Sequence, residues 1–241
     1  MLTSLFAKKR VVAQDQLPPQ HVPHSFDCVP EEKERFFALW HEYYAKHGNP
    51  SDPMRVLHLM NLVQTANGLA EGDYIELGVH IGLTLRLIHK FMDPSRTLYG
   101  LDTFEGFDAR DIKIEKTIYN NDWTVGNFNP TSIEGVNQYV GNPANLRLVK
   151  GWFPESFVGL EKKRWRFVHI DMDLYQPIKN AMALLWPNIV TGGVMLVHDY
   201  GCFGFRARIA VDEFAESIGI FPVQLADRWG SAVFRKPKPA V

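Results

Sequence analysis

The chain has 241 residues, of which 46% are hydrophobic and 22% charged, a balance typical of a globular protein with a substantial core. Its formal net charge of -1 at pH 7 gives no strong positive field, so nucleic acid and anionic membranes are not expected as partners and a small-molecule acceptor fits better. The two cysteines lie far apart, and no run of about 18 apolar residues predicts a membrane span. A secretory signal begins with basic residues, whereas the first ten residues here begin with apolar residues and end with basic ones. This order predicts a cytoplasmic protein.

Residues 1–50 are predicted to form an N-terminal arm followed by one helix. Residues 11–31 contain four prolines and little periodicity, which favours an extended arm. From Glu31 to Lys46 six apolar residues recur at helical spacing: Phe36, Phe37, Leu39, Trp40, Tyr43 and Tyr44. This stripe could pack on the core, form a lid over a ligand cleft, or pack against a second subunit and make a homodimer. The pattern leaves these three alternatives open.

Residues 51–241 are predicted to form one α/β domain. A helix is expected from Pro53 to a stop at Gly68, and strands with helices between them follow in chain order. The expected strands are 74–77, 97–101, 146–149, 167–170, 194–197, 223–226 and 232–234. The expected later helices are 83–91, one that begins at a capping box from Thr131 to Glu134, one over 178–185 and one over 206–217. Strands separated by helix-length segments pair in parallel through right-handed crossovers. The sequence therefore predicts a doubly wound, mostly parallel seven-stranded sheet that ends in an antiparallel hairpin.

A glycine-containing turn follows the first predicted strand. The segment Glu76 to Gly82 places Gly78 and Gly82 where the strand turns into a helix, at the sheet edge where open α/β sheets bind ligands. The GxGxxG fingerprint is absent, which argues against a nicotinamide dinucleotide, because its pyrophosphate needs a tight backbone cradle. S-adenosylmethionine has no phosphate, and a carboxylate such as that of Glu76 could face its ammonium group.

Two further segments are candidates for binding such a nucleoside cofactor. Asp102 ends the second predicted strand, where a carboxylate can accept hydrogen bonds from both ribose hydroxyls. After the third strand, Gly151 and Trp152 could bring an apolar wall to the adenine, although an ordinary packed aromatic residue would give the same pattern.

The densest polar chemistry follows the fourth and fifth predicted strands. Asp171 and Asp173 come after the fourth strand, and His198 and Asp199 after the fifth, so these side chains should meet at one sheet edge. Carboxylates held close together repel unless a cation neutralises them, which favours a divalent metal bound by Asp171, His198 and Asp199. Carboxylates alone suit Mg²⁺, whereas an imidazole ligand shifts the preference toward Mn²⁺, Fe²⁺ or Zn²⁺. Alternatively, the aspartates cap the following segments while His198 makes a buried hydrogen bond.

From about Met54 to Lys236 the chain resembles the macrocin O-methyltransferase family of TylF, MycF and NovP type, bacterial enzymes that methylate sugar hydroxyls of antibiotics. The matching stretches are YIELGVHIG at 74–82, LDTFEGF at 101–107, VKGWFPES at 149–156, DMDLY at 171–175, GG at 192–193, HDYG at 198–201 and AVDEF at 210–214. Their order and spacing together are specific, although each is weak alone.

The resemblance implies a class I, Rossmann-like methyltransferase domain over residues 51–241, with S-adenosylmethionine as donor and a divalent metal, Mg²⁺ or Mn²⁺, that orients and activates the acceptor hydroxyl. Glu76, Gly78 and Asp102 then fall on cofactor positions, and Asp171 and Asp199 on metal positions. The chain departs from the family at two places: His198 stands where the family usually has aspartate, and Met172 replaces a glycine.

Methyl transfer from a sulfonium is an in-line displacement, so the expected catalytic residues are those that position and deprotonate the acceptor: Asp171, with His198 or Asp173 as the base. Asp171 is also expected to border the cofactor. Two other functions remain open on the sequence alone. One is a nicotinamide-dependent oxidoreductase on a related sheet, and the other is a non-catalytic protein that binds S-adenosylmethionine but lost its metal site through His198. The acceptor pocket is expected to involve the 108–129 insertion, where Trp123 and Phe128 offer walls for a sugar or other polyol.

Overall fold

The computed structural model describes residues 33–47, 52–119, 122–129, 131–202 and 206–239. The chain forms two compact units, 1–53 and 54–241, and each is described by itself. In the first unit, helix α1 spans Lys33–His47, close to the helix expected from the aromatic stripe, while the arm predicted over 11–31 lies outside the described residues.

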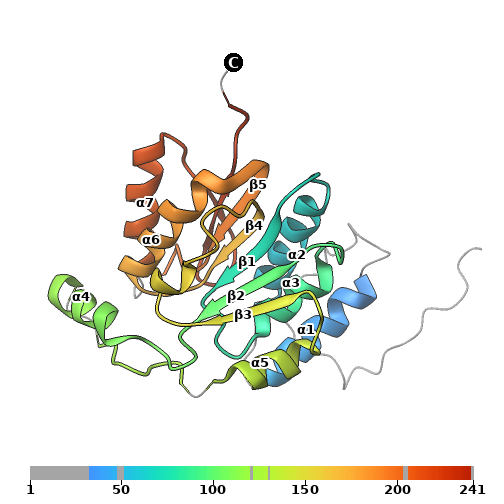
Figure 1. The fold of residues 1–241 in the computed structure, drawn as a ribbon, viewed down its shortest axis with the longest axis horizontal. Coiled ribbons are helices and arrows are strands. Elements are labelled where there is room, and N and C mark those ends of the chain that lie inside the picture. Colours follow the sequence, from blue (N-terminus) through green and yellow to red (C-terminus); the bar gives the residue numbers. More distant parts are fainter. Residues whose placement is uncertain (1–32, 48–51, 120–121, 130, 203–205, 240–241) are drawn as a thin grey trace, which may run out of the picture. The chain divides into compact units, whose positions relative to one another are not determined.

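Seven strands form the central sheet of the second unit (Figure 1). Their order is β3-β2-β1-β4-β5-β7-β6; all neighbours from β3 to β5 are parallel, and β7 is antiparallel to both β5 and β6. The strand bounds are β1 Asp73–Leu77, β2 Leu98–Asp102, β3 Leu146–Lys150, β4 Trp165–Ile170, β5 Ile189–Val197, β6 Val223–Leu225 and β7 Ser231–Arg235. The predicted doubly wound fold, with its terminal antiparallel hairpin, is confirmed.

Helices cover both faces of this sheet (Figure 1). One face carries α2 (Pro53–Asn67), α3 (Leu83–Phe91) and α5 (Ile133–Val140), and the other carries α4 (Ala109–Tyr119), α6 (Tyr175–Leu185) and α7 (Ala207–Ile218). Apolar side chains of α6, α7 and the central strands form the main core, including Ile75, Val168, Ile178, Met182, Met195 and Val211. None of the helices in the described ranges is long and apolar enough to cross a membrane.

One local prediction was wrong, and one helix was not predicted. The N-cap of α5 is Ser132 rather than Thr131: Ser132 Oγ accepts a hydrogen bond from Gly135 N–H at 3.0 Å, while the Thr131 hydroxyl donates to the carbonyl of His80. The 108–129 insertion also contains helix α4, which the sequence pattern did not reveal. Glu115 explains why this helix is stable here: its carboxylate is buried and accepts a hydrogen bond from Tyr175 N–H at 2.6 Å, at the N-terminus of α6.

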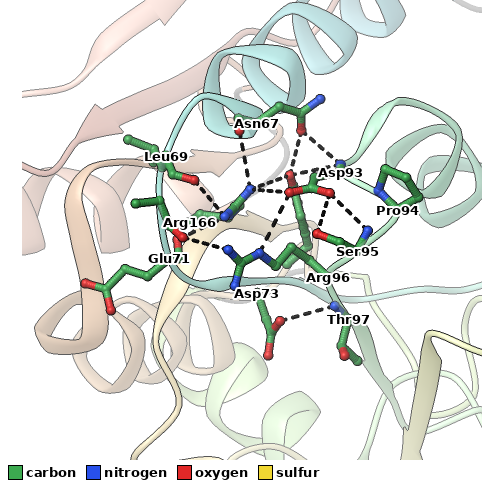
Figure 2. A network of polar contacts seen from close by, with 12 residues as sticks. Asn67, Leu69, Glu71, Asp73, Asp93, Pro94, Ser95, Arg96, Thr97 and Arg166 are labelled. Carbon is green, nitrogen blue, oxygen red and sulfur yellow. Dashed lines mark hydrogen bonds and ion pairs between the residues drawn. The ribbon is translucent and has the colours of Figure 1, made fainter.

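A buried arginine joins the amino-terminal ends of the strands. Arg166 in β4 has a fully buried side chain whose Nη2 donates to the carbonyl of Leu69 at 2.7 Å, while its Nη1 lies 3.2 Å from Asp93 Oδ2 (Figure 2). Its Nε also donates to the carbonyl of Glu71 at 3.2 Å. The loops after α2 and α3 are therefore tied to the central strand, opposite the edge at which ligands bind in such sheets.

Candidate functional site

The turn between β1 and α3 presses against the segment that follows β4. Gly78 has φ +85°, and a Cβ added to it would lie 1.9 Å from the backbone carbonyl oxygen of Asp171. Gly82, with φ +84°, precedes the first residue of α3. The positive φ angles explain why glycine stands at both predicted positions. At Gly78 a side chain is also excluded by the close approach of the loop that follows β4.

Asp102 organises this turn from the end of β2. Its Oδ2 accepts hydrogen bonds from the N–H groups of Val79 (2.8 Å) and His80 (2.9 Å), and its Oδ1 accepts one from Phe104 N–H (2.7 Å). The Thr103 hydroxyl also lies 3.4 Å from Oδ1, but it lies closer, at 2.6 Å, to the carbonyl of Gly106, so Oδ1 of this half-buried side chain keeps acceptor capacity. Asp102 lies where a ribose-binding carboxylate was predicted, and it also holds the turn in place.

Trp152 packs against the start of helix α4. Its indole N–H donates to Asp111 Oδ2 at 2.8 Å, and the guanidinium carbon of Arg110 lies 3.9 Å from the centroid of one of its rings. Gly151 N–H donates to the carbonyl of Asp102 at 2.9 Å, which places this loop directly beside the β2 carboxylate. The two residues predicted to form an adenine wall therefore neighbour Asp102, and Arg110 already covers part of the indole.

The contact between Asp111 and Trp152 predicts a pH-dependent change in stability. Burial raises the pKa of Asp111 to about 6, partly opposed by the hydrogen bond from Trp152, so the folded protein favours the protonated acid. Ionisation in an unfolded chain occurs near pH 3.9. The cost of keeping Asp111 charged is therefore absent below about pH 4, grows as the pH rises, and is complete above about pH 6.

We expect the stability of Asp111→Asn relative to the wild type to increase by about 1–2 kcal/mol between about pH 4.5 and pH 8, measured by urea unfolding. Asp108→Asn is the matched control, because the Arg110 hydrogen bond lowers the pKa of Asp108 and its loss should weaken the protein at pH 8. A relative stability of Asp111→Asn that fell with rising pH would contradict this assignment.

Four titratable side chains form a largely buried hydrogen-bonded network across the central strands. Glu76 and His169 are register partners on β1 and β4, so they point to the same sheet face, and Glu76 Oε1 lies 2.6 Å from His169 Nδ1. His169 Nε2 lies 3.2 Å from His198 Nδ1, and the same His198 nitrogen lies 3.0 Å from Asp171 Oδ2. The strand register therefore connects Glu76, inside the sheet, to the carboxylate at its edge.

This network determines the surroundings and the charge of two predicted site residues, Glu76 and His198. Glu76 is fully buried: its Oε1 lies 2.6 Å from His169 Nδ1, while its Oε2 has no hydrogen-bond partner among the described residues, and its contact with the ammonium group of a cofactor stays a prediction. Burial raises the pKa of Glu76 well above its usual range and lowers the pKa of His169 to about 4. His198 is 2% exposed, and burial, followed by the charge of Arg55, lowers its pKa well below 6.5. Both imidazoles are accordingly neutral near pH 7.

Three carboxylates meet where β4 and β5 end. Asp171, Asp173 and Asp199 each offer an oxygen within 4.8 Å of the others. Asp173 and Asp199 have φ values of +60° and +58°, a left-handed backbone that aspartate tolerates better than most residues. Burial and the neighbouring carboxylates raise the pKa of both, and Arg55, whose Nη2 donates to Asp199 Oδ1, lowers them in part. We call these three residues the carboxylate cluster.

The carboxylate cluster fits a divalent cation by its chemistry. Oxygen ligands of this kind suit Mg²⁺ and Mn²⁺, and a cation would relieve the mutual repulsion that raises their pKa values. A second group within the same 4.8 Å limit combines Asp171 with His169 and His198. The predicted trio of Asp171, His198 and Asp199 is thus divided between two groups in the described part of the chain, and Asp171 belongs to both.

Sequence reasoning missed three residues of this region. His169 was visible at the end of the fourth predicted strand, but its contact with Glu76 follows from the register between β1 and β4, which the sequence does not give. Asp111 and Arg55 lie on helices at sequence distances of 41 and 144 residues from their partners Trp152 and Asp199. No local pattern signals such contacts, because they arise from how the helices pack.

Comparison with known proteins identifies the family. The macrocin O-methyltransferase (TylF) family matches residues 53–236. A tetracenomycin-type rhamnosyl 4'-O-methyltransferase of Streptomyces olivaceus is 26% identical over 192 residues, covering 75% of this chain and 72% of that protein. Mycinamicin III 3''-O-methyltransferase of Micromonospora griseorubida is 27% identical over 181 residues, covering 69% of each chain.

A solved structure shares the fold. The O-methyltransferase NovP superposes with a TM-score of 0.62 at 22% identity, covering 77% of this chain and 81% of NovP. The resemblance predicted from the motifs is therefore confirmed, and the alternative of a nicotinamide-dependent oxidoreductase is set aside. With its matched family, sheet order and glycine turn, the chain belongs to the macrocin O-methyltransferase (TylF) family and is an S-adenosylmethionine-dependent O-methyltransferase.

Proposed function

We propose that this enzyme methylates a hydroxyl group of a sugar or another polyol, with assistance from a divalent metal at the carboxylate cluster. One observation carries the proposal: Gly78 lies so close to the carbonyl of Asp171 that the turn held by Asp102 and the carboxylate cluster must be immediate neighbours. A donor bound at the turn and an acceptor bound at the cluster would then be adjacent, as an in-line displacement requires. The relatives named above, which act on sugar-bearing molecules by their names, support a sugar acceptor.

The donor would bind along the carboxyl ends of β1 to β3. Asp102 has acceptor capacity for the ribose hydroxyls, and the neighbouring Gly151 and Trp152 would border the adenine. Gly78 and Gly82 shape the turn beneath it, and Glu76, at the end of β1 with one carboxylate oxygen that has no partner among the described residues, is the candidate for the ammonium group. Asp171 stands on the side of this site that faces the acceptor.

Asp171, Asp173 and Asp199 would hold the metal, with His198 as a further candidate ligand through its contact with Asp171. A bound divalent ion supplies Lewis acidity that lowers the pKa of the acceptor hydroxyl. The remaining step is removal of the hydroxyl proton. The imidazole of His198 is neutral and can accept it, and the carboxylate of Asp173, in the same cluster, is the second candidate.

Aromatic side chains of the 108–129 insertion and its flanks would border the acceptor. The rings of Phe107, Trp123 and Phe128 have centroids 5.1–5.8 Å apart, and His80 of the cofactor turn lies 5.4 Å from Phe128. These contacts place an apolar wall beside the turn. Sugars pack well on such rings, which is a further reason to favour a sugar acceptor.

Mass spectrometry of reactions with S-adenosylmethionine tests the proposal. Hydroxylated sugars, free and attached to apolar aglycones, are compared with catechols as acceptors. We expect a sugar product that carries one added methyl group and a reaction that slows when a chelator is present and recovers with Mg²⁺ or Mn²⁺. Methylation of catechols alone would overturn the sugar assignment, and full activity in chelator would overturn the metal assignment.

A further inference from the structure

Arg55 places a positive charge inside the carboxylate cluster. It lies in the first turn of α2, and its Nη2 donates to Asp199 Oδ1; the two side chains are 12% and 5% exposed. The guanidinium carbon also lies 5.4 Å from the centroid of a Trp229 ring, in the loop between β6 and β7. An arginine from one helix and an indole from a distant loop thus meet beside the end of β5.

The charge of Arg55 acts on the whole cluster and not only on its direct partner. It counters the effect of burial on Asp199 and Asp173 by lowering their pKa values. It also adds to burial in lowering the pKa of His198. These effects have the sign that a bound metal cation would produce, so Arg55 and a metal would stabilise the same charged carboxylates.

Arg55 and a divalent ion would also compete for the carboxylate of Asp199. The guanidinium occupies a hydrogen-bonding position of Asp199 Oδ1, and a cation within coordination distance of the same oxygen would be repelled by a fixed positive charge a few ångströms away. Binding of a metal ion by Asp199 is therefore weakened while Arg55 stays beside it and strengthened when Arg55 moves away. The guanidinium already lies over the neighbouring indole while it is bonded to Asp199, so this contact helps to hold the positive charge at the carboxylate.

We propose that Arg55 is a built-in competitor of the divalent ion for Asp199 and thereby sets the metal affinity of the carboxylate cluster. This inference rests on the proposed metal site. It implies that the enzyme binds its metal weakly. It also implies that Asp199 releases the guanidinium of Arg55 when it binds the metal.

Titration of Mn²⁺ into the full-length protein without acceptor, followed by calorimetry and by the electron paramagnetic resonance signal of free Mn²⁺, tests the inference. The variant Arg55→Met removes the charge and keeps an extended apolar side chain, and Arg55→Lys keeps the charge. The control is Arg228→Met, because Arg228 lies over the same Trp229 ring, at 4.8 Å, and the substitution removes the same charge there. Thermal unfolding of each variant shows that it is folded.

We expect Arg55→Met to bind Mn²⁺ at least about tenfold more tightly than the wild type, while Arg55→Lys and Arg228→Met remain within about threefold of it. Binding by Arg55→Met when the wild type binds none supports the inference in its strongest form. Equal binding by the wild type and Arg55→Met would overturn the inference and leave the proposed metal site intact. Absence of Mn²⁺ binding in every folded variant would overturn both.

Discussion

Asp171→Asn is expected to lower the turnover number at least about a hundredfold while the affinity for S-adenosylhomocysteine changes little. Asp171 is the residue shared by the two groups of candidate ligands, and its Oδ2 lies 3.0 Å from His198 Nδ1. Asparagine has the same shape and keeps one carbonyl acceptor for that contact, but it loses the negative charge. Steady-state kinetics would measure the first quantity and calorimetry the second.

Asp212→Asn is the matched control for this substitution. Asp212 lies on α7 and accepts a hydrogen bond from the Tyr200 hydroxyl at 2.7 Å, and its side chain is 47% exposed. The same chemical change there should leave turnover within about twofold of the wild type. If Asp171→Asn protein retained its activity after treatment with a chelator, the hypothesis of a metal at the carboxylate cluster would fail.

Arg166→Met is expected to destabilise the protein by about 3 kcal/mol, the second large effect. The substitution leaves Asp93 without its buried partner and removes the hydrogen bonds to the carbonyl groups of Leu69 and Glu71 (Figure 2). Asp93 itself is 25% exposed, which keeps the expected loss toward the lower end of the range for buried pairs. In a protein of this size the melting temperature should fall by about 6–12 °C, measured by calorimetry.

Arg164, two residues before Arg166, provides the control. Arg164 has a side chain that is 48% exposed and lies 3.7 Å from Glu71 Oε1, so Arg164→Met should change the unfolding free energy by less than about 1 kcal/mol. Arg166→Lys keeps a charge near Asp93 but cannot reach all the carbonyl groups, and an intermediate loss is expected. Equal stability of Arg166→Met and Arg164→Met would show that the network contributes little to folding.

Periodicity and glycine placement were sufficient to predict the sheet. All seven strands were predicted, and six begin and end within two residues of the expected bounds, because each is a short apolar run bounded by turn residues. β5 begins at Ile189, five residues before its expected start, since Thr191, Gly192 and Gly193 look like a turn in the sequence. Helix α4 was missed, since its apolar periodicity is weak and its position depends on the buried contact of Glu115 with the N-terminus of α6. The cap of α5 was misplaced by one residue, because Thr131 and Ser132 can both serve as caps and only the path of the chain decides between them.

The sequence by itself determined which residues stand at the carboxyl ends of the strands: Asp102, Asp171 and Asp199 fall there as a consequence of strand length and order. It could not determine what those side chains contact. Strand register brought Glu76 to His169, and helix packing brought Arg55 to Asp199 and Asp111 to Trp152. A local pattern specifies where a strand begins and ends, whereas contacts between distant segments depend on how the elements pack, which the tertiary structure alone decides.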